Sequence, residues 1–394
     1  MEQSLKQADT LPQTLIAVAA VAVGALVANI YYAQPLIVAI GGAVGVGPAL
    51  SGSLVSMVQI GYGVGLFLLV SLGDLVENRR LVLMAILAAA AALASLAFAR
   101  SATPFLLASL VVGFFSSCAQ ILVPFVAHLA PLARRGRVVG IVMGGLLTGI
   151  MLARPAALFI AGSFGWRAVF FSAAVLMLAV GLALARIMPS YQPRPGLHYG
   201  QVLASMLGIL RERPQVRWRA AYQGLMFCAF NLFWTVVPIL LAQKFGLSQH
   251  AIGLFALAGS GGALAAPVAG HIADRGHIAI ATTGAIAVLG LAFFAAIGVH
   301  GPIGLVWLTL LAVFIDAAVQ INQVVGQHVI FNVPGEIRGR VNAIYMTLVF
   351  AGGALGSVLG TLTYHAGGWT ATAATGGAIG ALALALNVLE RSRR

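Results

Sequence analysis

The sequence predicts an all-α membrane protein with twelve transmembrane helices in two pseudo-symmetric bundles of six. The membrane prediction depends on composition, because 61% of the 394 residues are hydrophobic, only 8% are charged and the mean hydropathy is +1.01. In ordinary globular domains about a quarter of the residues are charged. The division into two bundles depends on an internal repeat.

Twelve apolar segments are long enough to cross the roughly 30 Å hydrocarbon layer of a membrane as helices. Their expected ranges are 14–39, 50–72, 80–99, 104–128, 138–163, 167–188, 218–243, 250–272, 278–299, 303–331, 341–365 and 369–389. A stretch rich in proline and arginine separates the sixth from the seventh. We therefore expect a first bundle over 1–188, a cytoplasmic linker over 189–217 and a second bundle over 218–394. The amphipathic piece of the linker, Val202–Leu210, is expected to lie on the membrane surface.

The second half of the chain repeats features of the first at an offset of 203 positions. The tetrapeptide RGRV occurs at Arg135–Val138 and again at Arg338–Val341, and Gly165-Trp166 returns as Gly368-Trp369. Several coincidences in one register indicate a duplication.

The net charge of +13 lies mostly on one side of the predicted membrane. With loops numbered alternately, one side holds eighteen Lys and Arg residues and the other holds three, and Arg154 lies within a span. This asymmetry places both termini in the cytoplasm, and we expect the bacterial inner membrane as the location. The basic residues then face anionic lipid headgroups, and no nucleic acid is expected as a partner.

Metal, cofactor and enzyme chemistry find little support in the sequence. Cys118 and Cys228 fall in apolar spans, and the eight histidines form no cluster, so we expect neither a metal nor another cofactor. The nine acidic residues are scattered singly, whereas an enzyme would need paired carboxylates, a nucleophile or a metal set.

The first and seventh spans carry the same polar and aromatic pattern ahead of a proline. Asn29, Tyr31, Tyr32 and Gln34 surround Pro35, and Asn231, Phe233 and Trp234 precede Pro238. Proline removes a helical hydrogen bond, and in a membrane this is tolerated where protein or water satisfies the freed carbonyl.

Helical spacing places further polar groups on single faces. On the seventh span Gln223, Phe227, Asn231 and Trp234 follow steps of four, four and three, and on the tenth Asp316, Gln320, Gln323 and Gln327 lie at i, i+4, i+7 and i+11. Polar side chains in spans usually face a bundle interior or water. We expect a shared cavity between spans one, four, seven and ten, although the aromatic residues could equally be ordinary packing. The candidate substrate-binding residues are Asn29, Tyr31, Tyr32, Gln34, Gln120, Phe227, Asn231, Phe233, Trp234, Gln320, Gln323 and Gln327.

Two charged residues within spans are candidates for coupling transport to the movement of protons. Asp316 lies near the middle of the tenth span, where burial penalises its charged form and favours proton uptake. Arg154, in the fifth span, keeps its charge and needs an anion, an amide cluster or water. The two could pair across the halves, or each could be satisfied within its own half.

Twelve spans, two repeated halves and a basic middle loop resemble the major facilitator superfamily of secondary transporters. Leu72–Leu81 (LGDLVENRRL) is similar to the cytoplasmic signature of that superfamily, with Leu75 and Glu77 departing from it, and Gly270–Gly276 is similar to its second copy. Gly144–Arg167 resembles the fifth-span motif of proton-linked antiporters, and the NIYYAQPL stretch resembles the first span of bacterial drug:proton antiporters.

This resemblance implies a proton-coupled transporter that works by alternating access, and we expect a monomer. A mostly apolar, aromatic cavity with amides and few charges suits a small, moderately hydrophobic molecule, so we expect an exporter of such a compound. It also implies conformational gating by Asp74, Arg79, Arg80, Asp274 and Arg275. The open alternatives are a transporter of organic anions with Arg154 as the anion-binding residue, a non-transporting sensor, and a channel, which the twofold repeat disfavours.

Overall fold

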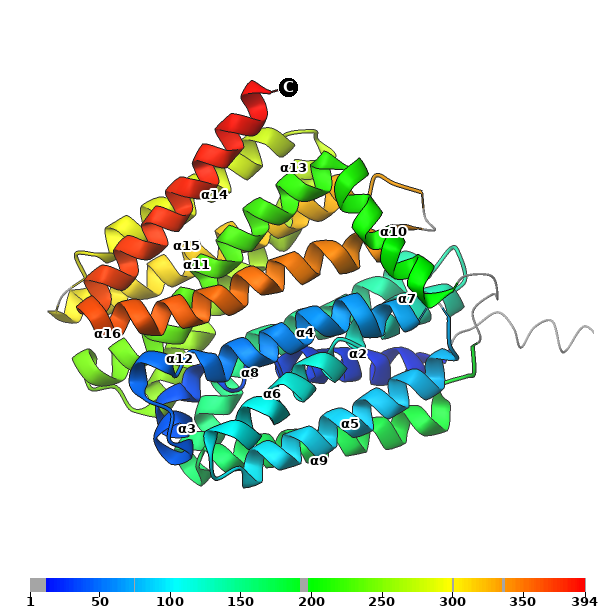
Figure 1. Ribbon diagram of the computed structural model, residues 1–394, viewed down its shortest axis with the longest axis horizontal. Coiled ribbons are helices and arrows are strands. Elements are labelled where there is room, and N and C mark those ends of the chain that lie inside the picture. The colour runs from blue at the N-terminus through cyan, green and yellow to red at the C-terminus, as the bar shows by residue number, and fades with distance from the viewer. Residues whose placement is uncertain (1–11, 74, 192–197, 300, 335–336, 394) are drawn as a thin grey trace, which may run out of the picture.

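The computed structural model of the protein describes residues 12–73, 75–191, 198–299, 301–334 and 337–393. Helices are the only regular secondary structure of these residues. Figure 1 shows two groups of roughly parallel helices, α2–α9 and α11–α16, with α10 crossing between them at one end. We call that end the linker end and the opposite one the far end.

Ten helical segments of the described residues are long and apolar enough to cross a membrane. Several of the predicted spans correspond to a single helix, and others correspond to two or three consecutive helical pieces. The helices are α4 (Ser53–Leu72), α5 (Asn78–Phe98), α6 (Ala102–Ser116) with α7 (Ala119–Leu129), α8 (Arg135–Phe164), α9 (Trp166–Ile187), α11 (Pro214–Phe245), α12 (Gln249–Gly259) with η3 (Ser260–Ala265) and α13 (Ala266–Asp274), α14 (Ile278–Ala296), α15 (Gly301–Ile330) and α16 (Arg338–Ser392).

The first predicted span is broken into three pieces. Helix α2 (Gln13–Ala28) ends where the polar stretch begins, and a turn leads to η1 (Gln34–Leu36) and α3 (Ile37–Val44). Pro35 lies in the first turn of η1, where its missing N–H costs no helical bond. The repeat-related Pro238 lies inside the continuous helix α11, so the two prolines act differently.

The last two predicted spans form one helical element that is interrupted at a glycine pair. Within α16, Gly367 and Gly368 leave helical geometry, and Gly368 has φ +64°. Gly165, between α8 and α9, has φ +81°, and a tryptophan follows each of the two glycines. Only glycine adopts such angles readily, so the repeated Gly-Trp pair marks the same break in each half. Twelve spans remain a prediction, since the described helices meet the spanning criteria in ten segments.

Glycines also bring helices of the same half close together. A Cβ on Gly149 of α8 would lie 2.2 Å from the carbonyl oxygen of Gly24 in α2. In the second half a Cβ on Gly352 of α16 would lie 2.2 Å from the carbonyl oxygen of Gly224 in α11. Gly149 and Gly352 are separated by the repeat offset, so small residues allow the same close helix packing in both halves.

At the far end the two halves contact each other directly. The backbone N–H of Gly52 donates to Thr361 Oγ1 (3.2 Å), and Thr361 Oγ1 donates to the carbonyl oxygen of Ala49 (3.0 Å). Across α8 and α12, the His250 ring contacts Gly162 and the ring of Phe159, with 5.5 Å between the ring centroids. These contacts close the far end.

At the linker end, helix α10 (Tyr199–Glu212) lies between the halves (Figure 1). Tyr199 Oη donates to the carbonyl oxygen of Leu68 in α4 (3.0 Å), and Arg340 of α16 donates to Ser205 Oγ (3.3 Å). Val202 and Met206 are fully buried. The expectation that this amphipathic segment lies on the membrane surface is therefore wrong, because its apolar face packs on the protein's own helices.

Candidate functional site

Arg154 is the centre of an aromatic cage where the two halves meet. Its side chain, on α8, is only 2% exposed, and its guanidinium carbon lies 4.8, 5.2 and 4.7 Å from the ring centroids of Tyr31, Phe230 and Trp234. Cation–π attraction of this kind is strongest where water is excluded. Arg154 Nε donates to Gln34 Oε1 (2.8 Å), while one terminal guanidinium nitrogen has no hydrogen-bond partner within the described structure.

Trp234 connects this cage to Asp316. The indole Nε1–H donates to Asp316 Oδ1 (2.7 Å), and the carboxylate is 8% exposed. Within the described part of the chain, no nitrogen of Arg154 lies within 4.0 Å of an Asp316 oxygen. The direct ion pair considered from the sequence is therefore not formed in this conformation, and Trp234 contacts both residues instead.

Gln34 joins the first half to the second through its amide. Its Nε2 donates to Asn231 Oδ1 (3.1 Å) and Thr235 Oγ1 (3.2 Å) of α11, while its Oε1 accepts from Arg154. Gln59 of α4 also donates to Asn231 Oδ1. These amides are fully buried, so the predicted polar residues form a packed network between the halves in this conformation and do not line an open cavity here.

Three predicted residues point away from this network. Asn29 donates to Ser116 Oγ (3.4 Å) within the first half, and Phe233 packs edge-on against the ring of Trp369 (6.1 Å) within the second. Tyr32 lines an apolar groove of about 340 Å³ between α2, α8 and α9. Neighbours in sequence point in different directions because each helical residue is rotated by about 100° from the next.

Gln120 and Phe227 lie beside the network. Gln120 Nε2 donates to Tyr62 Oη (3.4 Å), and the Tyr62 ring contacts Phe350 of α16 (4.5 Å between centroids). Phe227 stacks on Phe230 (5.5 Å) and meets Phe350 edge-on (5.2 Å). An aromatic cluster thus spans the two halves next to Arg154.

The glutamines of α15 continue from Asp316 toward the linker end. Gln323 Nε2 donates to Met346 Sδ (3.2 Å), and Gln320, Gln323 and Gln327 are all partly exposed. Partial exposure is consistent with a wet path on this side, whereas Asp316 itself is buried.

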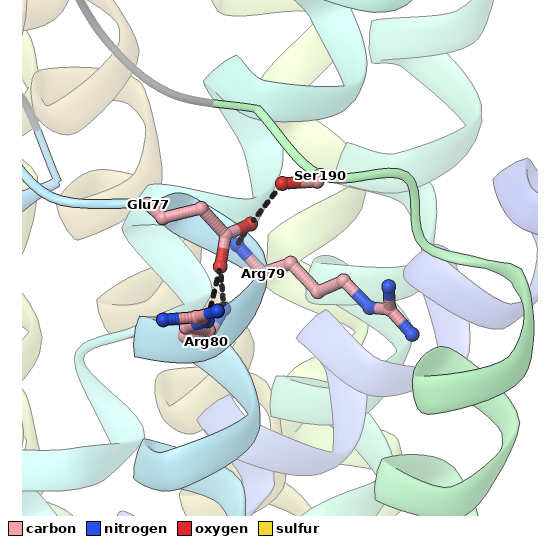
Figure 2. Close-up of polar contacts among 4 residues, drawn as sticks. All are labelled: Glu77, Arg79, Arg80 and Ser190. Atoms are coloured by element: carbon pink, nitrogen blue, oxygen red, sulfur yellow. Dashed lines mark hydrogen bonds and ion pairs between the residues drawn. The ribbon is translucent and has the colours of Figure 1, made fainter.

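The predicted gating residues of the first half contact their own half. Glu77 caps α5 by accepting from the backbone N–H groups of Arg79 and Arg80, and Ser190 donates to it (3.1 Å), as Figure 2 shows. Arg79 donates to the carbonyl oxygen of Ala185 at the end of α9 (2.6 Å). Desolvation alone would raise the pKa of Glu77, but the bonds from Arg80, Ser190 and Arg79 lower it below its ordinary value of 4.5.

The remaining gating residues have fewer contacts. Asp274, which is 74% exposed, lies 3.9 Å from His328 of the same half, and Arg275 is exposed. Asp74 lies outside the described residues. Each gating contact that the structure describes is made within one half, and none of them joins the halves at the linker end.

The sequence analysis did not single out Gln59, Thr235 or Phe230. Gln59 is the one amide in its predicted span, which was a usable signal. Thr235 and Phe230 are ordinary by residue type, and only the packing of α11 against η1 and α8 gives them partners.

Comparisons with known proteins address the whole chain. The family model described as Major Facilitator Superfamily matches residues 16–330 and 225–394. The uncharacterized transporter YgaY of Escherichia coli O157:H7 is 38% identical over 370 residues, which are 94% of this chain and 93% of that protein. The probable transporter SCO4007 of Streptomyces coelicolor is 35% identical over 89% of this chain and 81% of its own.

Solved structures share the fold at low sequence identity. The human organic anion transporter MFSD10 (TETRAN) has a TM-score of 0.67 at 18% identity, covering 96% of this chain and 100% of its own. A POT family transporter in complex with 5-aminolevulinic acid has a TM-score of 0.76 at 13% identity, covering 97% and 96%.

Proposed function

Because the chain belongs to the major facilitator superfamily, we propose that it is a proton-coupled secondary transporter that exports a small, moderately hydrophobic molecule. It is a multi-pass membrane transporter and not an enzyme. We further propose that the protein has twelve spans in two bundles, over 1–188 and 218–394, and that it works by rocker-switch alternating access. In this proposal it is a monomer without a cofactor, it lies in a bacterial inner membrane, and both of its termini are cytoplasmic.

Under this topology the linker end faces the cytoplasm. Most of the Lys and Arg residues belong to loops on that side, as the positive-inside rule requires. The direct contacts between Gly52, Ala49 and Thr361 then close the outer side, so we assign this conformation to the state closed toward the periplasm. A latch formed by Asp74, Arg79, Arg80, Asp274 and Arg275 at the cytoplasmic side would be released in this state. The contacts that Arg79, Arg80 and Asp274 make within single halves support this proposal.

One observation carries the proton coupling: a buried carboxylate lies where the halves meet, and no cation of the described residues is in direct contact with it. Asp316 is 8% exposed and accepts from Trp234, and Arg154 beyond the indole supplies positive charge without a salt bridge. A carboxylate held this way has a protonation state that affects the fit of the halves, which is the requirement for a coupling group.

The surroundings suit a substrate with apolar and hydrogen-bonding parts. Tyr31, Phe227 and Trp234 offer aromatic surface, and Asn231 and Gln323 offer amides. Such a mixture is typical of sites for small, moderately hydrophobic molecules.

The test uses purified protein in liposomes that contain a pH-sensitive dye. Dyes, antibiotics and aromatic metabolites are added one at a time, and proton movement is recorded under an imposed pH gradient. We expect at least one compound to drive proton flux in the wild type and in Glu212→Gln, an exposed control on α10, but not in Asp316→Asn, which should still bind that compound. Proton flux retained by Asp316→Asn would contradict the proposed coupling site, and no flux with any compound would favour a sensor.

The unpartnered guanidinium nitrogen of Arg154 favours a second candidate, transport of an organic anion. A buried donor without an acceptor is costly, and a substrate carboxylate would satisfy it. Thermal stabilisation by benzoate but not by benzamide, lost in Arg154→Gln, would favour this candidate over the first.

A further inference from the structure

We propose that Trp234 is a positioning residue that transmits the protonation state of Asp316, in the second half, to Arg154, in the first. This inference rests on the proposed proton coupling through Asp316. It adds a role that neither residue type nor spacing predicts, because the sequence suggests only an aromatic wall at this position.

A single indole makes both contacts that the role requires. Its N–H donates to Asp316 Oδ1 of α15 (2.7 Å), while its ring face lies 4.7 Å from the guanidinium carbon of Arg154 in α8. The first contact is within the second half, and the second crosses between the halves. Any change in the tilt of the indole therefore alters the fit of α8 against α11.

The indole has no free space in which to move independently of Asp316. It is 1% exposed, and a Cβ on Gly259 of α12 would lie 2.7 Å from its Cη2 atom. The Phe233 and Phe255 rings pack against it with centroids 5.4 and 6.2 Å away. Such a tightly packed side chain transmits displacement and does not absorb it.

The charges around Asp316 explain why a proton matters to this contact. The titratable groups that act on it electrostatically are Arg154 of α8 and Tyr31 of the turn after α2, while η3 presents Gly262 beneath its Cβ. A hydrogen bond to an ionised carboxylate is roughly twice as strong as one between neutral groups. Protonation of Asp316 therefore weakens the bond that orients the indole toward Arg154.

A purely structural role for the indole N–H is the competing explanation, and the chain supplies a matched control. Trp369 is also buried, and its Nε1 donates to the backbone carbonyl oxygen of Ala296 (2.8 Å). Replacing either tryptophan by phenylalanine keeps a ring and removes one buried N–H bond. Only Trp234 donates to a group that can gain a proton.

The experiment measures the conformational equilibrium without any substrate. Spin labels on Phe98→Cys and Lys244→Cys, at the far ends of the two halves, report the distance between them in the full-length protein in nanodiscs. Distances are recorded from pH 5 to pH 9 for the wild type, Trp234→Phe and Trp369→Phe. The native Cys118 and Cys228 are buried, which limits background labelling.

We expect the wild type and Trp369→Phe to change between two distance populations with the same midpoint. In Trp234→Phe the midpoint should move by about one to two pH units toward higher pH, or the transition should disappear, because a charged hydrogen bond has been lost. A Trp234→Phe midpoint equal to that of the wild type would overturn the inference.

A double variant keeps the test decisive if Trp234→Phe is less stable. Asp316→Asn removes the titrating group itself, so adding Trp234→Phe to it should change the distance populations no further. Additive effects of the two substitutions would also overturn the inference. A wild type that ignores pH would instead refute the proposed proton coupling, so the two failures are distinguishable.

Discussion

Gly52 offers a direct test of the far-end contact between the halves. Its backbone is helical (φ −59°), so alanine meets no conformational penalty, but an added Cβ would lie 2.1 Å from the carbonyl oxygen of Ser357 and 2.7 Å from Thr361 Oγ1. That is more than roughly 1 Å inside van der Waals contact, so α4 and α16 must separate there. Overpacking of this kind costs about 2 kcal/mol, within a range of about 1–3 kcal/mol.

The cost applies only while the far end is closed. We therefore expect Gly52→Ala to shift the equilibrium toward the state open at the far end by roughly 30-fold, since about 1.4 kcal/mol corresponds to a factor of ten. The assay is the rate at which a membrane-impermeant maleimide labels a cysteine at Ser357, which is fully buried where α16 lies against Gly52 in the closed far end.

Two glycines serve as controls for this experiment. Gly42 of α3, also at the far end, has nothing within 4 Å of the place that an added Cβ would take, so Gly42→Ala should leave the labelling rate unchanged. A Cβ on Gly61 would lie 2.0 Å from the carbonyl oxygen of Leu110 within the same half, so Gly61→Ala should lower thermal stability without favouring either state. Equal labelling rates in Gly52→Ala and the wild type would refute the reasoning.

Three further substitutions address the cage, the helix cap and the linker. Arg154→Lys keeps the charge but loses the planar fork that binds Gln34 within the cage, so we expect transport of any identified substrate to fall at least about tenfold in a flux assay. Glu77→Gln should cost about 1 kcal/mol at neutral pH through the weaker cap. Because the folded pKa of Glu77 is below 4.5, this difference in melting temperature should shrink as the pH falls through that lowered value. Tyr199→Phe removes the bond from α10 to α4 that this conformation contains, so we expect it to favour closure of the linker end about fivefold, as measured by spin-label distances. Tyr364→Phe loses a far-end bond within one half and should leave these distances unchanged.

Much of the helical framework could be predicted from the sequence, because apolar run length and proline position act locally. The repeated turn at Gly165 and Gly368 illustrates this, since the positive φ there favours glycine, whereas the break after Ala28 lies well before Pro35 and was not predicted. The place of α10 could not be predicted. Its buried methionine, Met206, would suit a lipid surface as well as a protein surface.

The candidate site was predictable in its chemistry but not in its contacts. Arg154 and Asp316 stand out in any hydropathy reading, since charges inside spans are costly. Their separation by Trp234 depends on the crossing of α8, α11 and α15, which spacing along one helix does not specify. Phe233, one position earlier on α11, points into the core of its own half for the same reason.

The contacts of Gln34 show how the two halves of a duplicated protein have come to differ. The amide of Gln34 accepts from Arg154 through its oxygen and donates to Asn231 and Thr235 through its nitrogen. Glutamate would place a carboxylate oxygen against Asn231 Oδ1, and leucine would leave all three partners without these bonds. The position 203 residues later holds Val237, which can make none of these bonds. The side chain that joins the two bundles thus comes from one copy only, and two bundles that both resembled the second would lack these bonds between them.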